Sequence, residues 1–522
     1  MENMHIPKEK FAFVPPEKRI SQQTDHHKHR GYFQDAWLRF RRNKASVVAA
    51  VIILAIVAYA FLTPLLITTR DVTTMCSTYA RKPARVTALR KLGIATGGVQ
   101  NMKPEAALVM LNGIAVGAES RGEEILRFAQ VLDSPYHPVL KLDQPVAQAR
   151  PNGSVATYYP TTTDTYLEVG FTYVIVDQPE YRRMLSWQEE TGLQLIYPHI
   201  DTQNGFCFMP ANANIWYKTQ GKGIPVSVDE GGTVTTLSYG EDLVLEDNYL
   251  RDGQGNLVYV QYTDSADVET AQVRLRVLYY NYYRYRYGSE PNYLFGTDAQ
   301  GYDLALRIAG GIRLSLLVAV CVSAINFLIG AAYGAVSGYY GGTTDLILSR
   351  ITDILNGLPF VVVATLFQIH LSRRVGAIPS LLFAYVLTGW IGTANRVRTQ
   401  FYRYKNQEYV MAARTLGARD RRIIWKHIFP NTLGTLITAS ALVIPRVILT
   451  ESMLSFLGIL KLGSARQTSL GTLLSNAGRN WTSAPHLLLY PALVISLLMI
   501  CFNLFGNGLR DAFNPALRGV ED

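Results

Sequence analysis

The sequence predicts a mainly α-helical, polytopic membrane protein with six transmembrane helices and an α+β domain inserted between the first two helices. Three observations predict this fold class. Six apolar runs approach or exceed the length that crosses a hydrocarbon core of about 30 Å. The polar residues 69–292 separate the first run from the other five. Basic segments, which typically stay on the cytoplasmic side of a membrane, flank several of the runs.

The first apolar run covers residues 46–68 and follows a basic, aromatic segment. Trp37 and Phe40 lie three positions apart, on one face of a helix, and arginines surround them. This pattern predicts an interfacial helix over residues 32–44. Because Lys and Arg are enriched on the cytoplasmic side, residues 1–45 are expected to be a cytoplasmic tail that ends in this helix.

Residues 69–292 have a different character, with many charges, turn signals and β-type runs. Strands are expected at residues 167–176, 257–262 and 273–287, and helices at residues 104–111 and 122–131. The segment is long enough to bury a core of its own, so we expect a folded α+β domain rather than disorder. With the N-terminus in the cytoplasm, this domain is expected on the extracytoplasmic side.

Two features of this domain leave alternatives open. Cys76 and Cys207 either stay free thiols or form a disulfide, which would contribute about 4–5 kcal/mol on the chain-entropy model. Residues 279–287 contain six tyrosines. They are either a docking or peptide-contacting surface, since Tyr and Arg are favoured at interfaces, or a strand whose aromatic face packs on its own core.

The remaining apolar runs lie at residues 314–336, 354–371, 378–393, 433–460 and 486–509. Residues 396–426, between two of these runs, carry nine Lys or Arg residues against two acids and are expected in the cytoplasm. Both chain ends are then cytoplasmic, including a tail at residues 512–522. The net charge of +10 is explained by such basic loops, so no nucleic acid is expected as a partner.

Two charged residues, Arg446 and Glu451, interrupt the run at residues 433–460. A charge inside the bilayer costs several kcal/mol unless it is paired or hydrated. These two residues either line a translocation path or lie near the membrane surface.

The basic loop contains a helix-turn-helix pattern. Residues 408–416 predict a short helix, in which Ala412 and Ala413 favour helix and keep the surface small. Gly417 permits the left-handed turn that ends this helix, and residues 420–429 predict a second one. Such a loop either fits a groove in another protein or is held by lipid headgroups.

The segment Glu408-Tyr409-Val410-Met411-Ala412-Ala413-Arg414-Thr415-Leu416-Gly417-Ala418 resembles the cytoplasmic "EAA" loop of ABC-importer permeases. Other boxes of that family occur in the same order, at Gly296-Thr297-Asp298, at residues 451–458 and at residues 506–511. The chain is most similar to the C-type subunits of oligopeptide and dipeptide permeases. It departs from them at Tyr302, at Asn507 and Asn514, and in the length of the insertion.

This resemblance implies the ABC type I importer fold, with a permease domain at residues 293–511 that holds helices 2–6 and an EAA loop at about 396–430. It also implies that Glu408, Ala412, Ala413, Arg414 and Gly417 couple the chain to an ATPase. The implied partners are a homologous second permease, two ABC ATPase subunits that bind ATP and Mg²⁺, a solute-binding protein and a peptide. The implied location is a bacterial cell membrane, which the chain crosses several times.

The chain itself has no GxxxxGK[ST], HExxH or GxSxG sequence and no clustered metal ligands. We therefore expect no catalytic residue, no cofactor and no metal in it. Two alternatives remain: the same transporter class acting on nickel, an oligosaccharide or an antimicrobial peptide, and a membrane-anchored sensor with an extracellular ligand-binding domain. In the transporter, the inserted domain is expected to hold the solute-binding protein or to cover the pore mouth.

Overall fold

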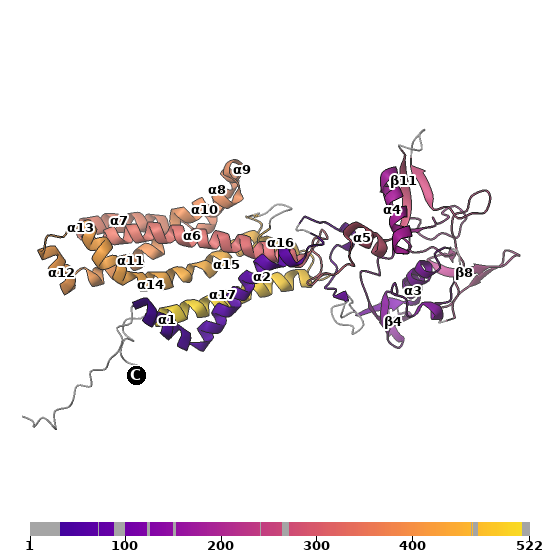
Figure 1. Ribbon diagram of the computed structural model, residues 1–522, viewed down its shortest axis with the longest axis horizontal. Helices are drawn as coiled ribbons and strands as arrows, with labels where there is room; N and C mark the ends of the chain where they lie inside the picture. Colours follow the sequence, from indigo (N-terminus) through magenta and orange to yellow (C-terminus); the bar gives the residue numbers. More distant parts are fainter. Residues whose placement is uncertain are drawn as a thin grey trace, which may run out of the picture.

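The structure, a computed structural model, consists of a helical bundle and an α+β domain that lie end to end (Figure 1). It describes residues 32–70, 73–87, 100–122, 126–149, 153–240, 242–263, 271–460, 462 and 468–513. Residues 1–31 of the tail predicted at residues 1–45, and residues 514–522 of the tail predicted at residues 512–522, lie outside these residues. The order of the elements is that expected from the sequence: two helices, the α+β domain, and the other helices of the bundle.

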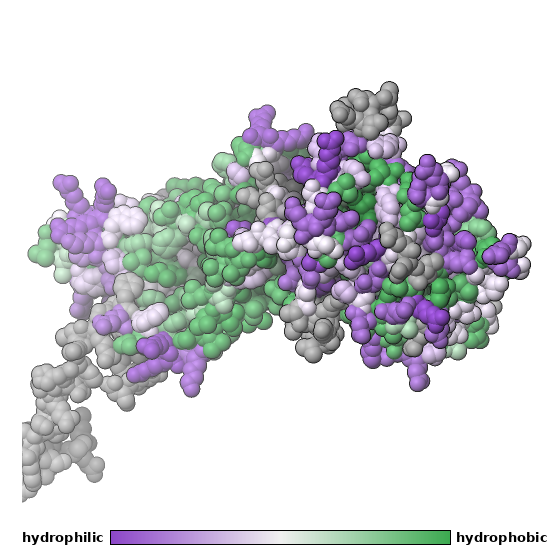
Figure 2. Space-filling view, turned by 45° about the vertical axis from the view of Figure 1, so that its right-hand side comes forward, coloured by the Kyte–Doolittle hydropathy of each residue, from purple (hydrophilic) through white to green (hydrophobic). Residues whose placement is uncertain are grey.

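The helices of the bundle are α1 (Tyr32–Arg42), α2 (Lys44–Leu66), α6 (Leu304–Tyr340), α7 (Gly342–Asn356), α8 (Phe360–His370), α9 (Ser372–Val375), α10 (Ala377–Thr388), α11 (Ile391–Tyr404), α12 (Glu408–Thr415), α13 (Asp420–Arg422), the π-helix η6 (Ile423–Ile428), α14 (Phe429–Ala441), α15 (Val443–Phe456), α16 (Leu470–Ala477) and α17 (His486–Ala512). An apolar surface covers much of the bundle in Figure 2 and ends at a more hydrophilic tip. Such a surface suits contact with lipid.

Among the described residues, five helical segments are long and apolar enough to cross a membrane: Lys44–Leu66, Leu304–Tyr340, Ala377–Tyr404, Asp420–Phe456 and His486–Ala512. A sixth span results only if α7 and α8, which are bent by 72° relative to each other, are one broken span. Pro359 precedes α8 at this bend, and a proline cannot continue a helical hydrogen-bond ladder. The expected count of six therefore depends on this pair.

Helix α6 packs closely against α11 through a stripe of glycines. Gly330, Gly334 and Gly338 recur every four residues on one face. A Cβ atom added at Gly330 or Gly338 would lie 2.7 Å or 2.6 Å from the Cβ atom of a residue on α11. Small residues at this spacing allow two backbones to approach in a membrane bundle.

The α+β domain contains three antiparallel sheets. One has the order β1-β4-β2, with β3 also paired to β4; the second has the order β10-β11-β5, with β6 paired to β11; the third is β7-β8-β9. The strands are β1 (Gln100–Pro104), β2 (Val139–Leu142), β3 (Val146–Ala149), β4 (Val155–Thr163), β5 (Phe171–Val176), β6 (Ile196–Tyr197), β7 (Thr219–Gln220), β8 (Ile224–Val228), β9 (Val234–Thr236), β10 (Val260–Thr263) and β11 (Gln272–Leu278). The helical elements are η3 (Ser77–Tyr79), α3 (Glu105–Glu119), η5 (Phe128–Val131), α4 (Gln178–Thr191) and α5 (Tyr279–Tyr287).

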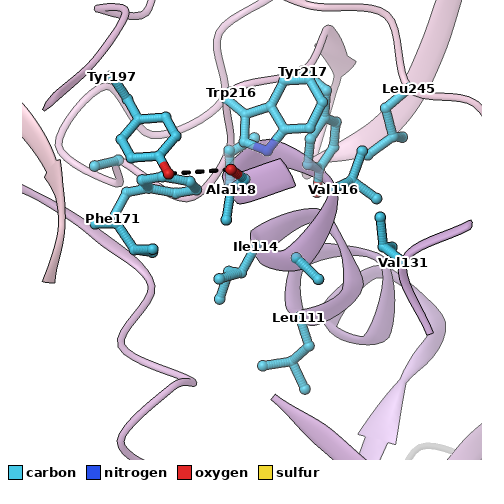
Figure 3. Close-up of a cluster of buried hydrophobic side chains, with 14 of the residues drawn as sticks. Leu111, Ile114, Val116, Ala118, Val131, Phe171, Tyr197, Trp216, Tyr217 and Leu245 are labelled. Carbon is cyan, nitrogen blue, oxygen red and sulfur yellow. Dashed lines mark hydrogen bonds between the residues drawn. The ribbon is translucent and has the colours of Figure 1, made fainter. Parts of the chain in front are cut away.

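The core of the α+β domain forms around α3, which is buried from Leu108 to Ala118 apart from one partly exposed residue. A helix that is apolar on all sides is stable only when it is enclosed. Figure 3 shows side chains that form this core: Leu111, Ile114, Val116, Val131, Phe171, Tyr197, Trp216, Tyr217 and Leu245. The Trp216 indole N–H donates to the Gly113 carbonyl oxygen (2.8 Å), and the Tyr197 hydroxyl donates to that of Ala118 (3.1 Å).

Two segments, residues 73–87 and 288–303, join this domain to the bundle, and we call them the neck. They pair with each other: Arg85 and Tyr293 form an antiparallel bridge, and the Cys76 N–H donates to the Gly301 carbonyl oxygen (3.2 Å). Because the two segments of the neck are hydrogen-bonded to each other, the domain is attached to α2 and α6 by a paired connection rather than by two separate linkers.

Buried ion pairs reinforce the neck. The Arg70 guanidinium lies 2.6 Å from the Asp303 carboxylate, and the Arg85 guanidinium lies 3.0 Å from that of Asp164. All four side chains are at most 4% exposed. Asp303 also accepts a hydrogen bond from the Ala305 N–H (2.8 Å) at the start of α6. One carboxylate thus links the end of α2, the neck and α6.

The predicted strand at residues 273–287 is wrong in its second part, because residues 279–287 form helix α5. Tyr279, Tyr283 and Tyr287 recur at four-residue spacing, which places them on one helical face. The Tyr283 ring packs on that of Tyr287 (centroids 4.5 Å apart) and on that of Tyr79 (5.5 Å). Tyr279 and Tyr283 are buried, so the packing interpretation holds for them, although in a helix.

Other expected elements are displaced. β5 and β10 begin three or more residues later than predicted, and α3 is longer than the helix expected at residues 104–111. Only residues 128–131 of the helix expected at 122–131 are helical among its described residues.

The disulfide considered from the sequence is not formed, since Cys76 and Cys207 are free thiols. Cys76 is buried in the neck, where its Sγ atom lies 2.9 Å from the hydroxyl oxygen of Tyr279. Cys207 packs instead at the edge of the core around α3. The two residues belong to different side-chain clusters.

Candidate functional site

The predicted helix-turn-helix is present as α12, a turn at Gly417, and α13 continuing into η6. Gly417 has a φ of +77°, which is the left-handed conformation expected of it. The Gly417 N–H donates to the Arg414 carbonyl oxygen (3.0 Å) and the Ala418 N–H donates to that of Ala413 (3.1 Å). These two bonds form a Schellman motif, which ends a helix and sets the direction of the chain after it. We call α12, this turn, α13 and η6 the coupling end.

Val410 anchors the coupling end, because it is fully buried in a cluster with Ile423, Ile424 and residues of α6 and α11. The opposite face of the coupling end is exposed. Leu416 is 88% exposed, and Met411, Tyr409 and Trp425 are exposed as well. Arg419, Arg421 and Arg422 surround Trp425 at a shallow hollow. The coupling end thus offers an apolar surface with a basic rim.

The coupling end is bonded to α6 through Tyr339. The Tyr339 hydroxyl donates to an Asp420 carboxylate oxygen (2.6 Å), and the Arg414 guanidinium donates to the Tyr339 hydroxyl oxygen (3.4 Å). Arg398 of α11 also makes two hydrogen bonds of 2.5 Å to Asp345 of α7. Bidentate pairs of this kind have a defined geometry, so this pair fixes α11 relative to α7.

The five residues predicted to contact an ATPase all lie on α12 or its turn. Ala412, Gly417, Glu408 and Arg414 are exposed, and Ala413 is half-buried. Within the described residues, the Glu408 side chain forms no ion pair or hydrogen bond. The sequence therefore located this surface, but it gave no sign of the contacts through Tyr339 and Asp345 that support it.

Arg446 and Glu451 lie on the same helix, α15, but in different surroundings. The Arg446 side chain is exposed and, among the described residues, has no ion-pair partner. Glu451 is 1% exposed. Hydroxyl groups of Ser315, Ser455 and Ser469 donate to its carboxylate at 3.1 Å, 3.0 Å and 2.6 Å. Glu451 therefore joins α6, α15 and the segment before α16.

Arg446 belongs to a row of four exposed arginines on one face of the bundle, with Arg396, Arg403 and Arg510. Three open cavities of about 640, 390 and 320 Å³ lie along this face, and Arg396 lines all three. The only acidic residue that lines any of them is Asp511. We call this surface the arginine face.

The 390 Å³ cavity of the arginine face also contains two polar groups that the sequence analysis missed, Asn326 of α6 and Tyr385 of α10. Both are more than nine-tenths buried, and the Asn326 Oδ1 atom has no hydrogen-bond partner within the part of the chain that the structure describes. Gly389 allows this arrangement, because a Cβ atom there would lie 2.8 Å from the Asn326 Nδ2 atom. The only sign of this cavity in the sequence was an asparagine within an apolar run.

Two family models match the chain. The model described as "Binding-protein-dependent transport system inner membrane component" matches residues 330–519, and that described as "N-terminal TM domain of oligopeptide transport permease C" matches residues 31–81. The coupling end and most of the arginine face lie within the first match. Most of the α+β domain lies between the two matches.

Curated relatives and solved structures each resemble a part of the chain. The dipeptide transport system permease protein DppC of Bacillus subtilis (strain 168) is 43% identical over 230 residues, which cover 43% of this chain and 69% of the relative. The oligopeptide transport system permease protein OppC of the same organism is 41% identical over 225 residues, covering 43% and 72%. An inward-facing structure of the MetNI methionine ABC transporter overlaps 40% of this chain and 96% of that chain at 16% identity and a TM-score of 0.32, a likeness too weak to inform the fold.

Proposed function

Because the chain belongs to the family of binding-protein-dependent transport inner-membrane components, in its oligopeptide permease C branch, we propose that it forms half of the pore of an ATP-driven peptide importer. Members of this family are non-catalytic permease subunits of ABC transporters. The relatives named above are a dipeptide and an oligopeptide permease. Their names favour a peptide over nickel or an oligosaccharide as the solute of this chain.

The observation that carries this proposal is the exposed apolar surface of the coupling end. Leu416, Met411 and Trp425 are exposed at the tip of the bundle, beside basic residues that suit the cytoplasmic side. An exposed apolar patch with a polar rim marks a site of protein–protein contact. We assign this patch to an ABC ATPase, with Ala412 and Ala413 keeping the contact face of α12 small and Gly417 setting its angle.

The same arrangement supports a proposed orientation in the membrane. The coupling end and the α+β domain lie at opposite ends of the bundle (Figure 1). With the coupling end and both termini in the cytoplasm, the α+β domain at residues 69–292 is extracytoplasmic, and residues 293–511 form the permease domain.

The proposed transport cycle needs partners that supply energy and substrate. Two ATPase subunits, which hold ATP and Mg²⁺, move the coupling ends of this chain and of a homologous second permease. A solute-binding protein delivers the peptide on the outer side. Arg446 lines the path, whereas Glu451, which three hydroxyl groups satisfy, holds the helices together. The peptide must bind the outward and inward states with different affinity for ATP to drive its uptake.

Purification of the tagged chain from gently solubilised membranes tests this function. We expect a second permease, P-loop ATPases and a solute-binding protein to co-purify, with ATPase activity in the preparation, and the recovered binding protein to bind peptides. Mass spectrometry and a phosphate-release assay measure both results. Recovery of the chain alone, without ATPase activity, would contradict the importer and favour a membrane-anchored sensor.

The α+β domain is proposed to hold the solute-binding protein or to cover the pore mouth. Arg85 and Tyr293 form a bridge, so a short glycine-serine linker can replace residues 86–291. Arg85→Ser accompanies this deletion, because Arg85 would otherwise lose its ion-pair partner Asp164. We expect peptide uptake to fall several-fold while the second permease and the ATPases still co-purify. Undiminished uptake by the shortened chain would refute this role.

A further inference from the structure

The cavity of about 390 Å³ on the arginine face lies within the bundle, far from both ends of α6. Asn326, which lines it, has 22 residues of α6 before it and 14 after it. At 1.5 Å per residue, roughly 20 Å or more of helix extends on either side. The cavity therefore lies at a depth where lipid, rather than water, surrounds a membrane protein.

The charges that line this cavity have one sign. Arg396 and Arg446 are its only charged residues, and the other polar groups on its wall are amides and hydroxyls: Asn326, Asn356, Tyr385, Thr388, Thr393 and Thr450. An arginine at this depth costs several kcal/mol unless an anion or water accompanies it. The cavity therefore favours an anionic group over a cationic one.

The two buried polar atoms add a second requirement. The Asn326 Oδ1 atom can only accept a hydrogen bond, and the Tyr385 hydroxyl can donate one. The Asn326 Oδ1 atom has no partner within the described residues, although such buried groups are nearly always satisfied. An inorganic anion offers no N–H group to Asn326. A peptide offers both an N–H group and a carbonyl oxygen beside its terminal carboxylate.

We infer that this cavity is a transit subsite for the C-terminal carboxylate of the transported peptide. Arg446, together with Arg396, pairs with the carboxylate, Asn326 accepts from a backbone N–H group, and Tyr385 donates to a backbone carbonyl oxygen. The volume of about 390 Å³ falls within the range of roughly 300–1,000 Å³ that is usual for small-ligand pockets. The inference rests on the proposed function and names the substrate feature that the pore recognises.

The test compares two peptides in the complete complex, reconstituted in proteoliposomes with its binding protein and ATP. Tri-alanine carries a free carboxylate, and tri-alanine amide does not. With Arg446→Gln, we expect uptake of tri-alanine to fall roughly tenfold or more, since the peptide carboxylate loses its charged partner, and uptake of the amide to change less than about twofold. The binding protein is the same in both preparations, so its own preference cancels when the variant is compared with the unmodified chain.

Two further variants act as controls. Arg373→Gln removes an exposed arginine of α9 that does not line the cavity, and it should leave uptake of both peptides unchanged. Arg446→Lys keeps the charge but not the two-pronged geometry, and it should restore part of the uptake of tri-alanine.

Three results would overturn the inference. An equal loss for both peptides would mean that Arg446 serves the path without recognising a carboxylate. Loss of the second permease from the purified complex would mean that Arg446 pairs with that subunit. Failure of the unmodified complex to import any peptide would overturn the proposed function as well, whereas the first two results leave it standing.

Discussion

Replacing Gly417 by valine is expected to reduce peptide uptake by at least about tenfold. Gly417 has a φ of +77°, and a β-branched residue in this conformation is strained by at least 1–2 kcal/mol. That strain is too small to unfold the chain, but it is relieved by opening the Schellman turn between Arg414 and Ala418. The exposed face of α12 would then point away from the position in which we propose that an ATPase contacts it.

Uptake in proteoliposomes and co-purification of the ATPases measure this effect, and the amount of second permease recovered shows whether the pore still assembles. Gly192→Val is the matched control. Gly192 also ends a helix, with a φ of +66°, and like Gly417 it has no neighbour within 4 Å of an added Cβ atom. It lies on the α+β domain, so the same strain there should spare the ATPase contact. Normal uptake by Gly417→Val would mean that the turn does not set the coupling.

The second large effect is expected from Asp164→Ala, which leaves Arg85 charged and buried. Both side chains of this pair are 0% exposed. Removing one partner of a buried ion pair typically costs about 3–5 kcal/mol, a large part of the 5–15 kcal/mol that stabilises a whole domain. The Asp164 carboxylate also accepts from the Tyr166 N–H (3.1 Å), so the turn after β4 loses a second support.

Thermal unfolding of the purified chain measures this loss. A cost of this size lowers the melting temperature of a domain of about 200 residues by roughly 6–20 °C. Asp143→Ala is the control, because the Lys141–Asp143 pair is exposed and such pairs contribute at most about 1 kcal/mol. If Asp164→Ala and Asp143→Ala melt together, the buried pair does not stabilise the neck.

The sequence was most informative where local physics determines the structure. In lipid, the polar groups of the backbone must be hydrogen-bonded within a helix. The long apolar runs therefore predicted the helices of the bundle. Ala412 and Gly417 favour a helix and a left-handed turn by their own chemistry, and α12 and its turn were predicted at the right residues. The EAA-type segment also identified the family before any fold was known.

The sequence failed where distant contacts decide the structure. Residues up to Leu278 alternate as in a strand, and nothing local marks the change to helix α5, which depends on packing against Tyr79 and Tyr293 in the neck. Similarly, the sequence does not show that Glu451 and Arg446 have different surroundings, because the Ser315 and Ser469 hydroxyl groups that bind Glu451 come from other segments. The same holds for Asn326, whose importance comes from the cavity that it faces.

Helix α6 runs without interruption for 37 residues, about 55 Å, between two well-bonded ends. Asp303 ties its first turn to Arg70 in the buried ion pair, and Tyr339 in its last turn is bonded to the coupling end. Such a helix is a lever arm: a tilt of about 10° displaces one end relative to the other by about 10 Å. Because the neck is paired and rigid, the α+β domain must swing with this lever. In the proposed orientation, a fluorophore on its outer tip would report, from outside the cell, each proposed ATP-driven movement at the inner face of the membrane.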